Sequence, residues 1–211
     1  MISFEISAKK LEVVAGAAAV VLAGLALGVL SGRAEKFDMA VLFFLKGARF
    51  PVFNELFLIL TYLGSVQFIS VATVCTGAIL FIKKRFGNMY LLAGTVFGNA
   101  ALVLLLKDLI ERARPAAALA VYSETSYSFP SGHTSAAVAF YGVLAYILAQ
   151  SYADTAKRAN ILFGWIFFMA MIGFSRMYLG VHYASDVMGG YALGFLCLSM
   201  GIILFEKFTK E

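Results

Sequence analysis

Six long runs without a charged residue constrain this chain more than any other feature of its sequence. Each run is mostly apolar and comes close to the roughly 17–25 residues with which an α-helix spans a bilayer. The runs are Val13–Gly32, Leu56–Ile82, Phe86–Leu106, Thr134–Ala153, Ala159–Ser175 and Val187–Phe205. Strands of a membrane barrel would instead alternate apolar and polar residues over about ten positions. The sequence therefore predicts an all-α, polytopic membrane helix bundle with six transmembrane helices, forming one domain over residues 1–211.

The composition agrees with a membrane protein, because 62% of the residues are hydrophobic and only 14% are charged. The first apolar run is longer than the roughly 7–15 residues of a signal peptide and no A-x-A site follows it, so a retained anchor is expected. Cys75 and Cys197 lie inside apolar runs and lack the spacing of a redox or zinc motif. The net charge of +5 does not come from a basic stretch interleaved with aromatic residues, so nucleic-acid binding is not expected.

Basic residues at alternate boundaries of the runs predict the orientation. One set comprises Lys9, Lys10, Lys83, Lys84, Arg85, Lys157, Arg158, Lys207 and Lys210. The positive-inside rule places this set, and with it both termini, in the cytoplasm. The opposite boundaries hold nearly as many basic residues, namely Arg33, Lys36, Lys46, Arg49, Lys107, Arg112, Arg114 and Arg176. The rule therefore favours this orientation only if some of the outer cations have another task. Both histidines of the chain lie at these outer boundaries.

Aromatic residues surround the connection before the second run. Phe43, Phe44, Phe50 and Phe53 flank Pro51 there. Such a segment is typical of an interfacial stretch that lies on the bilayer surface.

Lys107 and Arg114 lie at the outer end of the third run. Seven residues separate them, which on a helix places both side chains on one face about two turns apart, where both can point at one anion. Pro115 disfavours helical geometry at Arg114 and is expected to end the helix there. Basic residues at a helix end can equally complement the helix dipole or anchor lipid headgroups. The pair alone leaves both interpretations open.

The segment Phe129–Ser135 opens the fourth run. Ser131 is a natural N-cap, and Gly132 lets a ligand approach the backbone. The free N–H groups of a helix start bind phosphate. An ordinary capped helix, with His133 as a bystander polar residue, would have the same local sequence.

Arg176, His182 and Asp186 precede the sixth run. The i,i+4 spacing puts the Asp186 carboxylate beside the His182 ring if a helix begins there. Such a carboxylate fixes the tautomer and raises the nucleophilicity of the other ring nitrogen. A simple surface ion pair is the alternative, but ionisable residues in a nearly uncharged bundle favour a functional cluster.

Together the three segments read K-x6-R-P, P-S-G-H and S-R-x5-H-x3-D, and in this order the sequence resembles the type 2 phosphatidic acid phosphatases, also called lipid phosphate phosphatases. The positions that carry the resemblance are Lys107, Arg114, Pro115, Pro130, Ser131, Gly132, His133, Ser175, Arg176, His182 and Asp186. The resemblance covers the third to the sixth run, with the catalytic motifs within 107–186. The length and the helix count fit small bacterial members.

The resemblance implies a catalytic mechanism. His182 would attack phosphorus to form a phosphohistidine, Asp186 would orient it, and His133 would protonate the leaving oxygen. The phosphate oxygens would be held by Lys107, Arg114, Arg176 and the amides of Ser131 and Gly132. Several fixed cations suit phosphoryl transfer, since charge spreads over the phosphate oxygens in the transition state.

Catalysis without a metal or another cofactor is expected. The outer face lacks an acidic cluster of the kind that binds magnesium, because Asp108 and Glu111 stand beside basic residues there. Tyr122, Glu124 and Tyr127 precede the P-S-G-H segment and could line the entrance, although a solvated loop is favoured.

The resemblance also implies a bacterial cytoplasmic membrane, and the orientation expected from the basic residues puts the active site on its non-cytoplasmic side. The favoured substrates are undecaprenyl diphosphate and phosphatidylglycerol phosphate, while phosphatidic acid and the 1-phosphate of lipid A also present a terminal phosphate. A lipid phosphotransferase and a phosphatase of soluble sugar phosphates remain alternatives within the enzyme class. A small transporter is less favoured, because the charges gather at one face rather than at mid-depth.

Overall fold

The computed structural model describes residues 7–210, and within them the chain is a bundle of α-helices without strands. The elements are α1 (Ala8–Leu30), α2 (Glu35–Gly47), α3 (Pro51–Tyr62), α4 (Val66–Ile82), α5 (Phe86–Ile110), the 3-10 turn η1 (Ala117–Leu119), α6 (Gly132–Gln150), α7 (Thr155–Tyr178) and α8 (Ala184–Lys210). The expected all-α class is confirmed. Residues 1–6 and 211 lie outside the described part, so the placement of the two extreme termini is not tested.

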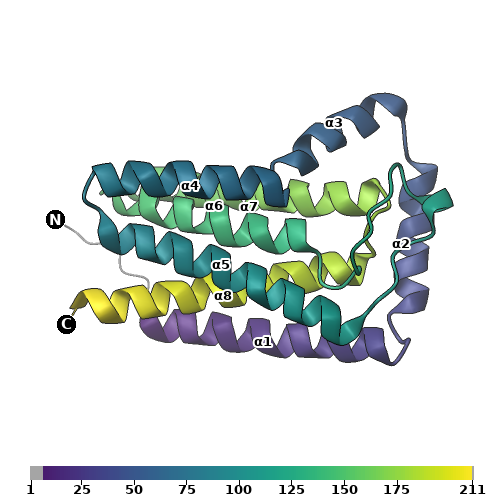
Figure 1. The fold of residues 1–211 in the computed structure, drawn as a ribbon, viewed down its shortest axis with the longest axis horizontal. Helices are drawn as coiled ribbons and strands as arrows, with labels where there is room; N and C mark the ends of the chain where they lie inside the picture. Colours follow the sequence, from purple (N-terminus) through teal and green to yellow (C-terminus); the bar gives the residue numbers. More distant parts are fainter. Residues whose placement is uncertain (1–6, 211) are drawn as a thin grey trace.

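Within residues 7–210, five helices are each long and apolar enough to cross a membrane, namely α1, α5, α6, α7 and α8. The second apolar run is the exception, because α3 and α4 share it and meet at a bend of 42°. Where six spans are expected, the described part of the chain has five unbroken helices and one bent pair, which makes a sixth span if the pair crosses as one. In Figure 1 α4 lies along the bundle, whereas α3 tilts away from it.

The break between α3 and α4 has a local cause. Ser65 caps α4, since its side chain accepts a hydrogen bond from the Phe68 amide. Tyr141 of α6 donates to the Leu63 carbonyl at 2.9 Å, which satisfies a backbone group that the break releases. A Cβ at Gly64 would lie 2.8 Å from Cγ2 of Ile172 and 3.2 Å from the His133 carbonyl oxygen. The break thus lets the chain approach the start of α6 closely.

Helix α6 is the most buried of the candidate spans in the described part of the chain, and it packs against α4, α5, α7 and α8. Glycines allow its close approach to α8. A Cβ at Gly190 would lie 2.6 Å from the Ser131 carbonyl oxygen, and one at Gly194 would lie 2.5 Å from Cβ of Val138. The two glycines therefore permit close helix packing, which holds the start of α6 against the start of α8.

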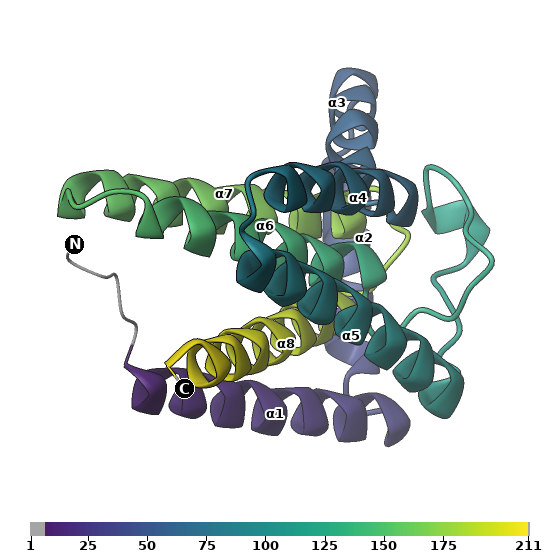
Figure 2. The same cartoon turned by 60° about the vertical axis from the view of Figure 1, so that its left-hand side comes forward.

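Helix α2 lies across one end of the bundle (Figure 1). It buries Asp38, Leu42 and Leu45 and exposes Phe43 and Phe44. This amphipathic helix stands where the aromatic residues predict an interfacial stretch. The long connection between α5 and α6 lies at the same end as α2, while α1 begins and α8 ends at the other (Figures 1 and 2).

Candidate active site

His182 lies in the turn between α7 and α8, with 1% of its side chain exposed. Gly180 has φ +74, a conformation that favours glycine, and it lets the chain reverse after α7. The Nδ1 atom of His182 lies 3.4 Å from Oδ2 of Asp186 in the first turn of α8. The predicted pairing is therefore present, although α8 begins at Ala184 rather than at His182.

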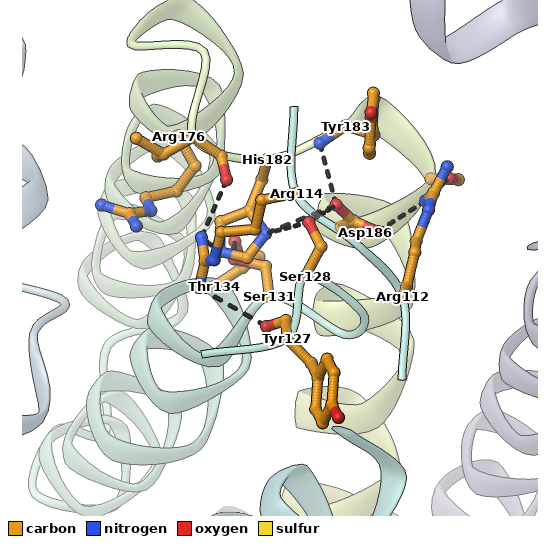
Figure 3. Close-up of polar contacts among 12 residues, drawn as sticks. Arg112, Arg114, Tyr127, Ser128, Ser131, Thr134, Arg176, His182, Tyr183 and Asp186 are labelled. Atoms are coloured by element: carbon orange, nitrogen blue, oxygen red, sulfur yellow. Dashed lines mark hydrogen bonds and ion pairs between the residues drawn. The ribbon is translucent and has the colours of Figure 1, made fainter. Parts of the chain in front are cut away.

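The other ring nitrogen of His182 faces the predicted phosphate ligands, because Nε2 lies 3.2 Å from Nη1 of Arg114 (Figure 3). Burial lowers the pKa of His182 to about 4, and the nearby charges of Arg176 and Arg114 act in the same direction against the raising effect of Asp186. The ring is thus neutral near pH 7. The Asp186 carboxylate and the Arg114 guanidinium both favour the tautomer with the proton on Nδ1, which leaves the lone pair at Nε2 available to attack an electrophile.

Asp186 is fully buried and uses both carboxylate oxygens. Oδ2 accepts hydrogen bonds from Ser128 Oγ at 2.5 Å and from the Tyr183 amide at 2.9 Å, besides facing His182. Oδ1 lies 2.6 Å from Nη1 of Arg112 (Figure 3). The carboxylate is therefore held in one orientation by three neighbours besides the histidine.

Arg114 lies in the chain after α5, which ends at Ile110 rather than at Arg114 as predicted. Its guanidinium donates to the Ser126 carbonyl at 2.6 Å and to the Val181 carbonyl at 2.8 Å. Lys107, in the last turn of α5, donates to the Tyr127 carbonyl. The two cations therefore bind neighbouring carbonyl groups of the loop before α6, although only Lys107 lies on a helix.

Arg176 projects from the last turn of α7 and is fully buried. It donates to the Thr61 hydroxyl at 2.8 Å and to the Tyr122 hydroxyl. It also forms an ion pair with Glu124, whose second carboxylate oxygen lies 2.7 Å from Nη2 of Arg114. One carboxylate thus bridges the two guanidiniums.

Glu124 is held in an ion-pair network, contrary to the solvated loop that the sequence favours. Burial would raise the pKa of its carboxyl, but the charges of Arg176 and Arg114 outweigh burial and lower the pKa to about 2. The group is therefore anionic at neutral pH. A cavity of about 110 Å³ lies beside it, lined in part by Arg114, Tyr122 and Val181. A larger, apolar groove of about 900 Å³ lies between α5 and α8, away from these residues.

Ser131 and Gly132 stand at the start of α6 as predicted, but the Ser131 amide is occupied, because it donates to the Asp186 carbonyl at 3.0 Å. The Ser131 hydroxyl accepts a hydrogen bond from the Thr134 hydroxyl and does not cap the backbone of α6. Phosphate binding by the Ser131 amide stays a prediction, and it would require this amide to leave the Asp186 carbonyl. The amides of Gly132 and His133 remain at the helix start, where they have no partner within the helix.

His133 is the second residue of α6. The charged groups close enough to interact with it electrostatically include Arg176, Glu124 and His182. The structure thus gathers both histidines and the predicted cations at one end of the bundle.

Three residues of this site were not singled out from the sequence: Asp38, Arg112 and Ser128. Glu124 was named there only as a residue that could line the entrance, although it is the only charged residue between Arg114 and Pro130. The burial of Asp38 could also have been predicted, since its spacing places it on the same helix face as Leu42 and Leu45. Arg112 and Ser128 follow no such pattern.

Among residues 7–210, no three His, Cys, Asp or Glu side chains lie close enough to hold a metal ion. The carboxylates at the site are bound instead by arginines, Asp186 by Arg112 and Glu124 by Arg114 and Arg176. Catalysis without a metal remains a prediction.

Comparisons with known proteins identify the family. The model of the PAP2 superfamily matches residues 87–210. Phosphatidylglycerophosphatase B of Bacillus subtilis (strain 168) is 38% identical over 151 residues, which cover 70% of this chain and 73% of that protein. Decaprenylphosphoryl-5-phosphoribose phosphatase of Mycobacterium tuberculosis is 34% identical over 122 residues, covering 56% and 61% of the two chains.

Two solved structures are similar. The crystal structure of the transmembrane PAP2-type phosphatidylglycerolphosphate phosphatase from Bacillus subtilis superposes with a TM-score of 0.83 at 29% identity, covering 93% of this chain and 96% of that one. Aquifex aeolicus LpxE superposes with a TM-score of 0.64 at 25% identity, covering 79% and 94%. The chain therefore belongs to the PAP2 superfamily, among its membrane-spanning lipid phosphatases.

Proposed function

We propose that this protein removes the terminal phosphate of a membrane lipid through a phosphohistidine on His182. The observation that carries the proposal is the placement of the His182 ring. Its Nδ1 faces the Asp186 carboxylate, and its Nε2 faces a guanidinium of a cationic cradle. A neutral, oriented imidazole beside fixed cations is the arrangement that nucleophilic phosphoryl transfer requires.

The first half-reaction forms a bond between Nε2 of His182 and phosphorus and breaks the bond from phosphorus to the lipid oxygen. His133 supplies a proton to that oxygen, and the lipid leaves. Lys107, Arg114 and Arg176 hold the phosphate oxygens together with the amides at the start of α6. Cations fixed in advance stabilise the charge on these oxygens without reorganising during the reaction.

The second half-reaction transfers the phosphoryl group to water. His133, left neutral by the first step, takes a proton from the attacking water. The bond from phosphorus to Nε2 breaks, and orthophosphate is released. His182 regains its neutral form, still oriented by Asp186.

Glu124 occupies the position between Arg114 and Arg176 that a phosphate group needs. Substrate binding therefore requires its carboxylate to move aside, because two anions would compete for the same guanidiniums. With a pKa of about 2, Glu124 competes as an anion throughout the neutral range.

We further infer that the site faces the non-cytoplasmic side of a bacterial cytoplasmic membrane and that the whole chain acts as one domain. The inference is supported by the basic residues near the opposite end of the bundle, which include Lys9, Lys83 and Lys157.

Phosphatidylglycerol phosphate and undecaprenyl diphosphate are the favoured substrates. The names of the similar proteins support both classes, since one is a phosphatidylglycerophosphatase and another acts on a decaprenyl phosphate derivative. Phosphatidic acid and lipid A 1-phosphate share the terminal phosphate that the cradle would recognise.

Phosphate release from purified protein in detergent, measured on these four lipids with a chelator present, tests the proposal. Turnover of at least one lipid without a divalent metal is expected. Appearance of the phosphate on a lipid acceptor instead of in water would identify a phosphotransferase. No turnover without magnesium would contradict metal-free catalysis.

A further inference from the structure

Asp38 is a fully buried carboxylate on an amphipathic helix, which is rare unless the group is paired. Its partners lie near the catalytic dyad rather than on α2. Oδ1 accepts from the Ser185 amide at 2.9 Å, and Oδ2 accepts from the Ser185 hydroxyl at 2.6 Å. Oδ2 also lies 2.6 Å from Nη2 of Arg112. Helix α2 is therefore bound directly to the start of α8.

Arg112 lies between two carboxylates. Its Nη2 binds Asp38, while its Nη1 lies 2.6 Å from Oδ1 of Asp186 and 2.7 Å from the Ser185 hydroxyl. The guanidinium also lies over the Tyr183 ring, 4.3 Å from the ring centre. A planar guanidinium presents donors along two edges in fixed directions, so it can orient both carboxylates at once. Asp38, Arg112, Asp186 and His182 thus form a continuous chain of contacts.

This chain of contacts determines which oxygen of Asp186 serves His182. Arg112 occupies Oδ1, so Oδ2 is the oxygen presented to Nδ1 of His182. Removing Arg112 would free Oδ1 and leave the carboxylate held through Oδ2 alone, by Ser128 and the Tyr183 amide. The acceptor of the His182 ring would then be less firmly oriented, and the Nε2–H tautomer, which has no lone pair for attack, would gain population.

The charge of Asp38 has a separate consequence. If Asp38 were removed, Asp186 would be the only carboxylate paired with Arg112. The charge of Arg112 would then weaken the attraction between Asp186 and the Nδ1 proton of His182. With Asp38 present, the two carboxylates and the guanidinium together carry one negative charge. That charge also favours the cationic ring that forms when Nε2 bonds to phosphorus.

We propose that Arg112 and Asp38 are positioning residues that act on His182 through Asp186, so that α2 is part of the catalytic machinery. The proposal rests on the roles assigned above to His182 and Asp186. Asp38 and Arg112 contact the dyad rather than the Arg114–Arg176 cradle, so their loss should lower kcat more than it raises KM.

The test compares Arg112→Gln and Asp38→Asn with matched changes at exposed positions, Arg33→Gln and Glu35→Gln. Both positioning variants should lose about ten- to a hundredfold in kcat/KM on a lipid phosphate, the range seen when outer partners of catalytic groups are removed. The controls should keep the activity of the unaltered protein. Thermal unfolding in detergent establishes that each variant is folded.

The same two changes are then introduced into an Asp186→Asn protein, where they should cause little further loss, because their effect passes through Asp186. If each change lowered kcat/KM as much in the Asp186→Asn protein as in the protein with Asp186, the positioning proposal would be overturned, while the roles of the dyad would stay intact. An Asp186→Asn protein with full activity would instead contradict the proposed function of the dyad.

A second readout does not depend on residual turnover. Nitrogen-15 spectra of His182, recorded in a His133→Ala protein that contains no other histidine, report which ring nitrogen carries the proton. The unaltered dyad should show the Nδ1–H form. Arg112→Gln and Asp38→Asn should increase the Nε2–H form, and an unchanged tautomer with lost activity would overturn the proposal.

Discussion

At the residue scale, the two histidines stand at different points of the site. His182 is fixed by Asp186 and faces the cradle, whereas His133 projects from the start of α6 among the same charges. This difference fits the roles proposed above, with His182 as the nucleophile and His133 as the proton donor. Replacement of each histidine should therefore affect different substrates.

His182→Ala should abolish phosphoryl transfer from every substrate, because no covalent intermediate can form. His133→Ala should lose about two to four orders of magnitude in kcat/KM on lipid monoesters, whose leaving alkoxide needs a proton. The loss should be milder on nitrophenyl phosphate, whose leaving group is stable without one. An equal loss of His133→Ala on both substrates, or substantial turnover by His182→Ala, would show that the roles are wrong.

The lowered pKa of His182 can be measured directly. Because the folded protein shifts this pKa to about 4, the ring should remain neutral through pH 6 and 5 and become protonated only as the pH falls through about 4. Protonation removes the lone pair at Nε2, so the nucleophile is lost on the acid side. A nitrogen-15 titration of the His133→Ala protein in detergent reports the midpoint, and a value near the ordinary 6.5 would contradict the described environment.

At the element scale, the spans followed from the sequence because a continuous apolar run has few folded states in a bilayer other than a helix. The bend between α3 and α4 did not follow, because it depends on contacts of Gly64 with Ile172 and His133, far away in the sequence. The three motifs that the structure brings together could be predicted from the sequence, because their order and spacing resemble those of a known family. Asp38 and Arg112 could not, since they acquire their roles only when α2 packs against α8.

The bend between α3 and α4 provides a test of packing. Gly64→Ala should destabilise the protein by about 1–3 kcal/mol, the usual cost of overpacking, because the added methyl group would lie 2.8 Å from Ile172. The shift it forces at the His133 backbone should also lower kcat/KM. Gly77→Ala in α4 is the matched control, since nothing lies within 4 Å of its added Cβ. Equal melting temperatures for the two variants in detergent would contradict the close approach at Gly64.

At the scale of the whole molecule, the candidate active site lies at one end of the bundle, and the basic residues that the positive-inside rule places in the cytoplasm lie near the other. Ala118 in η1 is exposed at the first end, and Ala153 is exposed in the connection between α6 and α7 at the second. The proposed orientation places Ala118 outside the cell and Ala153 in the cytoplasm.

Single cysteines at these positions test the orientation, in a protein whose Cys75 and Cys197 are replaced by alanine. A membrane-impermeant thiol reagent should label Ala118→Cys in intact cells and label Ala153→Cys only after permeabilisation. Labelling of Ala153→Cys from outside would reverse the assigned orientation.

The central claim is that the phosphoryl group is transferred first to His182 and then to water. Two successive in-line displacements invert phosphorus twice, so a chiral, isotopically labelled thiophosphate ester hydrolysed in labelled water should give product with retained configuration at phosphorus. The stereochemical course of hydrolysis is therefore the most direct measurement. Retention is the predicted result, and inversion, which a single attack by water would produce, would contradict the phosphohistidine mechanism.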